Sequence, residues 1–133
     1  MGRSLHDLVR DRAGDRCEYC HVPQEFVPAT FHVEHIIAKQ HRESEDSENL
    51  CLSCDRCNLH KGPNLSGIDP ETDNIVLLFH PRHQRWSRHF RWHGPILLGL
   101  TQTGRATIAV LAINNPERVE FREHLLDNGE FEG

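Results

Sequence analysis

A glutamate and a histidine stand next to each other at positions 34 and 35, within the short apolar segment "FHVEHI" (31–36). A carboxylate binds hard divalent cations such as Mg²⁺ and Mn²⁺, and an amide carbonyl such as that of Asn58 can add a second oxygen ligand. An imidazole titrates near neutrality, so His35 can take a proton from an attacking water. Glu34, His35 and Asn58 therefore carry the groups that metal-assisted hydrolysis of a phosphodiester requires, which are a metal site and a base.

Four of the five cysteines form two C-x-x-C pairs, Cys17 with Cys20 and Cys54 with Cys57. Each pair can supply two thiolates from one tight turn, and structural zinc takes four ligands in a tetrahedron. We therefore expect a structural Zn²⁺ held by these four cysteines, in preference to a redox pair or unpaired thiols. Cys51 is left over, and we expect it to be a small buried side chain in a strand.

The segments between the cysteine pairs must position these side chains. The sequence predicts a short strand over 30–36, a second strand over 49–53, and a helix over 54–62 that ends at Gly62 and Pro63. Two zinc-binding turns would then hold one end of this β-β-α unit together.

Neighbouring side chains of a strand point to opposite faces. If the first strand ends at Glu34, however, the chain turns there and both Glu34 and His35 can face the helix that carries Asn58. The interval between the two cysteine pairs is long enough to hold such a hairpin.

We expect one α+β domain over 1–133, with the β-β-α core at about 17–64 and an α/β extension at about 65–133. Ser4 and Gly14 predict the start and end of an N-terminal helix. Its expected apolar face consists of Leu5, Leu8 and Val9.

The C-terminal extension has a less regular pattern. We expect, in order, a loop over 64–74, a buried strand over 75–79, a basic connector over 81–94, a strand over 95–100, a segment over 101–113 that is either a strand or a buried helix, and a helix from Pro116 to about 126.

The stretch 17–61 resembles the HNH endonucleases, also called ββα-metal or His-Me finger nucleases. The resemblance rests on "CEYC", "EHI", "ENL", "CDRCN" and "HKG", in that order and at similar offsets. It implies that His35 is the general base, that Glu34 and Asn58 hold a divalent metal, and that Asn49 ties the loop backbone so that His35 is aimed. It also implies structural zinc at the four cysteines, and DNA cleavage that leaves 5′-phosphate and 3′-hydroxyl ends.

Two features depart from the family pattern. Glu34 stands where the family more often has aspartate, and the loop after His35 carries "ESEDSE" (43–48) in place of a proline and paired glycines. The rest of the chain is similar, more loosely, to the C-terminal extension of small standalone bacterial HNH proteins.

Each candidate site residue also has a non-catalytic alternative. These are a hydrogen-bonded structural histidine at His35, a solvent-facing charge at Glu34, and a cap at Asn49.

Charge is distributed unevenly along the chain, which has a net charge of −5. The sequence between Asp73 and Glu117 contains no acidic residue, and in it Arg82, Arg85, Arg88 and Arg91 recur every three residues among aromatic side chains. This basic stretch predicts a DNA-binding surface. The candidate phosphate contacts are Lys61, Arg82, Arg85 and Arg88. The alternatives are arginine stems that pack over aromatic rings, and a Lys61 that favours the C-terminus of its helix.

Together these patterns predict a metal-dependent DNA endonuclease with structural Zn²⁺ and catalytic Mg²⁺ or Mn²⁺. One alternative is a non-catalytic, zinc-dependent nucleic-acid-binding module, although a pure binder has no need of a metal and a base. Another is a DNase toxin with an immunity partner. The charged N-terminus lacks a secretory pattern and no apolar stretch could span a bilayer, so we expect a cytoplasmic protein. We expect a monomer, which would nick DNA, or a homodimer, which could make two cuts.

Overall fold

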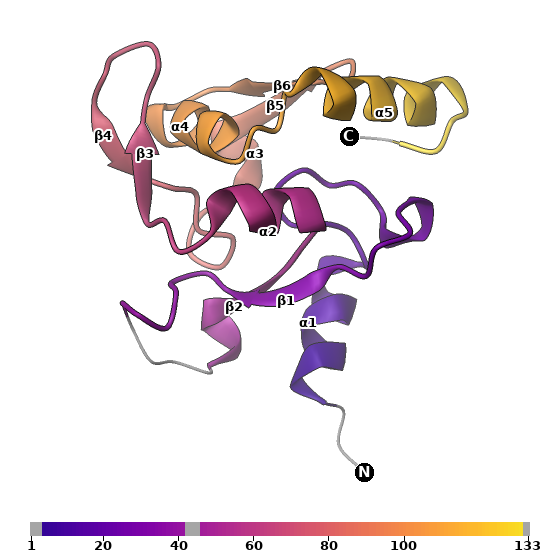
Figure 1. The fold of residues 1–133 in the computed structure, drawn as a ribbon, viewed down its shortest axis with the longest axis horizontal. Coiled ribbons are helices and arrows are strands. Elements are labelled where there is room, and N and C mark those ends of the chain that lie inside the picture. The colour runs from indigo at the N-terminus through magenta and orange to yellow at the C-terminus, as the bar shows by residue number, and fades with distance from the viewer. Residues whose placement is uncertain (1–3, 42–45, 132–133) are drawn as a thin grey trace.

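The computed structural model describes residues 4–41 and 46–131. Residues 42–45 lie outside the described residues, and they include the first half of the acidic segment 43–48 that follows His35. The described residues form a fold of the α+β class, built from helices and three separate two-stranded antiparallel hairpins (Figure 1).

The N-terminal half contains the predicted β-β-α unit. Strands β1 (His32–His35) and β2 (Leu50–Ser53) pair antiparallel, and helix α2 (Asp55–Lys61) follows directly. Helix α1 (Leu5–Ala13) packs against the hairpin, and α2 contacts β1. In Figure 1 the hairpin lies between the two helices.

The caps of α1 are the predicted ones, but its apolar face is narrower than expected. The Ser4 hydroxyl accepts a hydrogen bond from the backbone N–H of Asp7 at 3.1 Å, and Gly14 ends the helix with φ 65°. Val9 is fully buried, whereas Leu5 and Leu8 are 37% and 43% exposed. A helix of nine residues that packs on a four-residue strand can bury only part of its apolar face.

The C-terminal half contains more regular structure than the sequence predicted. Its elements are β3 (Ser66–Ile68), β4 (Ile75–Leu77), α3 (Trp86–His89), β5 (Phe90–His93), β6 (Ile96–Gly99), α4 (Gln102–Val110) and α5 (Pro116–Asp127). Strand β3 lies in the predicted loop, and the predicted connector contains both α3 and β5. The ambiguous segment is a helix, capped where the Thr101 hydroxyl accepts from the N–H of Gly104.

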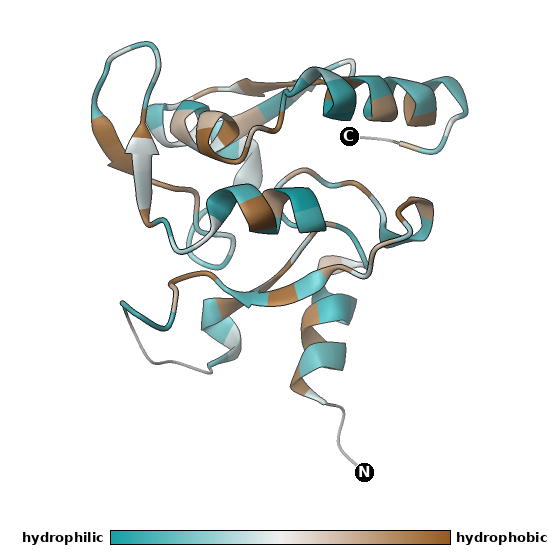
Figure 2. Ribbon diagram, in the orientation of Figure 1, coloured by the Kyte–Doolittle hydropathy of each residue, from teal (hydrophilic) through white to brown (hydrophobic). Residues whose placement is uncertain are grey.

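The prediction of a buried strand over 75–79 was wrong in part. Ile75 and Leu77 are 74% and 71% exposed, whereas Leu78 and Phe79, just after the strand, are buried. Strand β4 pairs only with β3, and α4 covers one face of this hairpin, so the alternate side chains remain uncovered. Figure 2 shows this apolar strand on the hairpin that projects from the rest of the fold.

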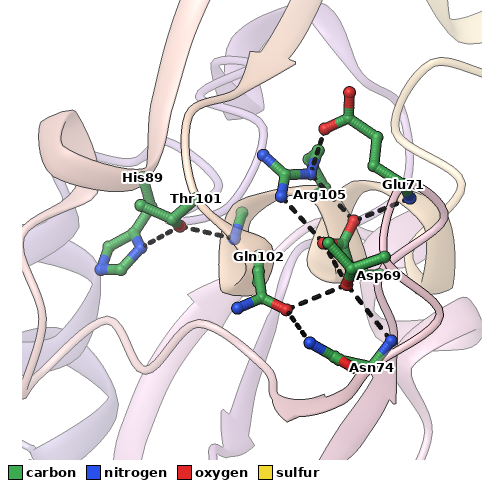
Figure 3. A network of polar contacts seen from close by, with 9 residues as sticks. Asp69, Glu71, Asn74, His89, Thr101, Gln102 and Arg105 are labelled. Atoms are coloured by element: carbon green, nitrogen blue, oxygen red, sulfur yellow. Dashed lines mark hydrogen bonds and ion pairs between the residues drawn. The ribbon is translucent and has the colours of Figure 1, made fainter.

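A buried ion pair attaches the β3–β4 hairpin to α4. Asp69 is fully buried and accepts two hydrogen bonds of 2.8 Å from the Arg105 guanidinium. These hydrogen bonds hold the pKa of Asp69 well below its ordinary value. The Gln102 side chain accepts from Thr72 and Asn74 beside it (Figure 3). The long turn of the hairpin is thereby held against the helix.

We expect Asp69→Asn to lower the thermal unfolding midpoint of the zinc-loaded protein by about 5 °C or more, because it leaves Arg105 without its buried charge partner. Glu71→Gln is the matched control, since Glu71 also pairs with Arg105 but is 66% exposed. Circular dichroism melts measure both variants. Equal midpoints would contradict the anchoring role of Asp69.

Candidate functional site

The four cysteines of the two C-x-x-C pairs form one buried cluster. The sulfur atoms of Cys17, Cys20, Cys54 and Cys57 all lie within 4.8 Å of one another. Those of Cys20 and Cys54 are 3.7 Å apart. A tetrahedral Zn²⁺ with Zn–S bonds of about 2.3 Å places its sulfur ligands about 3.8 Å apart, so the cluster fits this ion. Four thiolates in a buried, closed arrangement suit a structural zinc.

The two halves of the cluster come from different local structures. Cys17 and Cys20 lie in the turn between α1 and β1, where His21 has φ 63° and its N–H bonds the Cys17 carbonyl. Cys54 is the N-cap of α2, and the N–H of Cys57 donates to its sulfur at 3.4 Å. The cluster therefore joins the first turn of α2 to the turn that precedes the hairpin.

The structure brings Glu34, His35 and Asn58 to one open cavity of about 420 Å³. Strand β1 extends through His35, one residue further than the sequence argument assumed. Both side chains nevertheless line the cavity, because the hairpin ends there and the chain leaves the sheet. Asn58 reaches the cavity from α2. Lys39 and Leu59, which the sequence did not indicate, line its rim.

Glu34 lies over a buried polar group that comes from β2. It is paired across the hairpin with Cys51, whose thiol is 3.8 Å from the carboxylate. Burial raises the pKa of Glu34 to about 7, and the nearby Lys61 ammonium opposes this shift without cancelling it. A carboxylate that is costly to ionise in the folded protein gains from a bound cation.

Asn49 is buried and holds the backbone just beyond His35. Its amide nitrogen donates to the Ile37 carbonyl at 3.1 Å, and its amide oxygen accepts from the Ile37 N–H at 2.9 Å. Its own carbonyl accepts from the N–H of Ile36. Asn49 ends a short 3₁₀ turn (Ser47–Asn49) instead of starting the second strand. Asn49 thus fixes the N–H of Ile36 and both the N–H and the carbonyl of Ile37, directly after His35.

Lys61 is also directed inward. It is 2% exposed, and its ammonium donates to the Ile36 carbonyl at 2.8 Å. Together with Asn49 it fixes the backbone that leaves His35. This position favours a structural role, and it does not leave the ammonium open to a DNA phosphate.

The candidate DNA-binding arginines divide into buried and exposed ones. Arg82 is ion-paired with Glu18, and the side chains are 10% and 12% exposed. Burial lowers the pKa of Arg82 to about 10. Arg85 and Arg88 are exposed. For Arg82 the geometry favours the structural alternative, whereas the other two arginines remain accessible to a phosphate.

Arg118 contacts the cysteine cluster, and no local sequence signal indicated this contact. Its Nη2 atom is 2.9 Å from the sulfur of Cys57, which lies 61 positions earlier in the chain. Burial lowers the pKa of Arg118, but the Coulombic interactions with Cys57, Cys20 and Cys54 together outweigh it and raise that pKa above its ordinary value. Cys51 is fully buried in β2, as the sequence predicted, and the hairpin register places it opposite Glu34.

The family model described as HNH endonuclease matches residues 17–64. This segment is an HNH endonuclease domain. The match begins at the first zinc-site cysteine and ends just after α2, so it covers the cysteine cluster, the hairpin and the cavity. Neither the curated proteins nor the solved structures gave a match. Within the described residues, none of the helices has the length and apolar character to cross a membrane.

We expect Cys54→Ser to lose the bound zinc and to unfold the HNH domain, because three thiolates no longer complete the tetrahedron. Cys51→Ser is the control, since Cys51 is equally buried but lies outside the cluster. Metal content by mass spectrometry should be about one zinc per chain for Cys51→Ser and close to none for Cys54→Ser. A full zinc complement in Cys54→Ser would rule out the four-cysteine site.

Proposed function

We propose that this protein is a metal-dependent endonuclease that hydrolyses DNA phosphodiester bonds. The observation that carries the proposal is that Glu34, His35 and Asn58 line one open cavity of the HNH domain. An acid, a base and an amide from two elements converge there, on the side of α2 that faces solvent.

Glu34 and Asn58 supply two oxygen ligands, which fits Mg²⁺ or Mn²⁺ because such ions keep several waters and take phosphate oxygens as further ligands. When bound, the ion would stabilise the negative charge that develops on the phosphate and the leaving oxygen. His35 would accept a proton from the attacking water at an imidazole nitrogen. Asn49 would hold the chain after His35 so that the ring keeps its direction.

DNA would reach the cavity from the solvent side. Arg85 and Arg88 are exposed and belong to the acid-free part of the sequence, so they are the candidates for phosphate contacts. A monomer with one such site would nick a duplex. Cleavage of both strands would need a homodimer or two encounters.

The second candidate function is a nucleic-acid-binding module that does not cut. The zinc cluster and the exposed arginines would serve it equally well. The partly buried Glu34 disfavours it, since a carboxylate with a pKa of about 7 beside an imidazole serves no purpose in binding a polyanion.

We expect the zinc-loaded protein to nick supercoiled plasmid in Mg²⁺ or Mn²⁺, and His35→Ala to reduce the rate by about 100-fold or more because it removes the base. His60→Ala is the matched control, since His60 is exposed on the same helix as Asn58. His35→Ala should retain its zinc and its melting temperature. No cleavage by the wild type in either metal, with zinc bound, would favour the binding module.

We also expect Mn²⁺ affinity in the absence of DNA to fall by up to tenfold per pH unit as the pH drops from 7 to about 5.5. The pKa of Glu34 is raised to about 7, so below that pH a proton occupies the carboxyl and Mn²⁺ must displace it. Electron paramagnetic resonance of free Mn²⁺ in a His35→Ala background excludes the imidazole from the titration. Glu34→Gln should bind weakly and without this pH dependence. A pH-independent affinity in the presence of Glu34 would contradict the ligand assignment.

A further inference from the structure

The guanidinium of Arg118 lies against the zinc cluster from outside the HNH domain. Its Nη2 atom is 2.9 Å from the sulfur of Cys57 and 3.9 Å from that of Cys54. Arg118 belongs to α5, in the C-terminal extension. It therefore makes a direct contact between the extension and the first turn of α2.

The other side of the guanidinium is held by backbone. Nη1 donates to the carbonyls of Leu111 and Ala112 at 2.7 and 3.2 Å. Ala112 has φ 51°, so the chain turns sharply there before α5 begins. Asn115 caps that helix and fixes its first turn, three residues before Arg118. Carbonyls on one side and sulfur atoms on the other leave the guanidinium one orientation.

The contact places a positive charge beside a metal centre that is negatively charged when zinc is bound. A Zn²⁺ ion with four thiolates has a formal charge of about −2, and burying that charge is costly without a nearby cation. A hydrogen bond from a cation to a thiolate also withdraws electron density from the sulfur. Arg122, one turn further along α5, points elsewhere, to the Pro95 and Ile113 carbonyls and over the Trp92 ring.

The contact also lies at a cavity that two of the cysteines line. Cys20, Cys54, Arg118 and Phe121 are among the residues that line a cavity of about 340 Å³. Arg56 is exposed at the same cavity. A chelator or an oxidant that approaches the sulfur atoms through this opening meets Arg118 beside them.

We propose that Arg118 is a positioning residue of the zinc centre, which compensates the charge of the thiolates, slows zinc release, and fastens α5 to the HNH domain. The proposal rests on zinc at the four cysteines and is independent of nuclease activity. It concerns a residue 61 positions beyond the last zinc cysteine, in a part of the chain that the family match does not cover.

The test is the rate at which zinc passes from the full-length protein to a coloured chelator in excess. We expect Arg118→Met to release zinc about tenfold faster or more, in line with the loss of an outer-shell partner. Arg56→Met is the matched control, because it removes the same charge from the same cavity without touching a sulfur contact. It should release zinc at the wild-type rate.

Cobalt substitution gives a second readout that a general loss of stability would not move. With Co²⁺ at the four cysteines, the sulfur-to-metal charge-transfer absorption should shift to lower energy in Arg118→Met, because the thiolates become more electron-rich. If that variant does not fold, Arg118→Lys serves instead, since one ammonium cannot bond the two carbonyls and a sulfur together as the guanidinium fork does. It should still release zinc faster than the wild type. Wild-type release and an unshifted spectrum in the folded variant would overturn the proposal.

Discussion

The fold depends on the four cysteine sulfurs, which join the turn before β1 to the first turn of α2. Strands of four residues and a helix of seven are too short to be stable alone, and an isolated two-stranded hairpin is marginal in water. Zinc coordination at the cluster would supply the missing stability and fix α2 against β1. Asn58 lies directly after the last zinc cysteine, so whatever holds Cys57 also places Asn58 opposite Glu34 and His35.

A second set of contacts works at the other end of the hairpin. Asn49 and Lys61 bind the backbone of Ile36 and Ile37, so the chain just beyond His35 is held from both β2 and α2. The backbone beneath the cavity is therefore fixed, while the cavity itself is open to solvent. In this position the ionised form of Glu34 is unfavourable, and this is the cost of the arrangement, since burial of the carboxylate raises its pKa. A divalent cation at the cavity would relieve that cost.

The sequence predicted the parts of the structure that rest on local patterns. Cysteine spacing, strand-turn signals and helix caps located the β-β-α unit and α5, because each follows from residues a few positions apart. The hairpin β3–β4 was missed because Gly67, within β3, and Pro70, in the turn, are signals of a loop. Its stability comes from Asp69 and Arg105, which are 36 positions apart. The sequence also could not show that Lys61 and Arg82 point inward. A basic residue looks the same in a sequence whether its side chain contacts a DNA phosphate or, as here, a buried carbonyl (Lys61) or a carboxylate (Arg82).

We propose that Glu34 and Asn58 hold a divalent metal next to His35, on a scaffold that a structural zinc fixes elsewhere. Crystals of the zinc-loaded His35→Ala protein soaked in Mn²⁺ would test it by anomalous diffraction at two wavelengths. We expect zinc at the four cysteines and manganese within bonding distance of the Glu34 carboxylate and the Asn58 carbonyl oxygen. Manganese bound on other side chains, with that cavity empty, would contradict it.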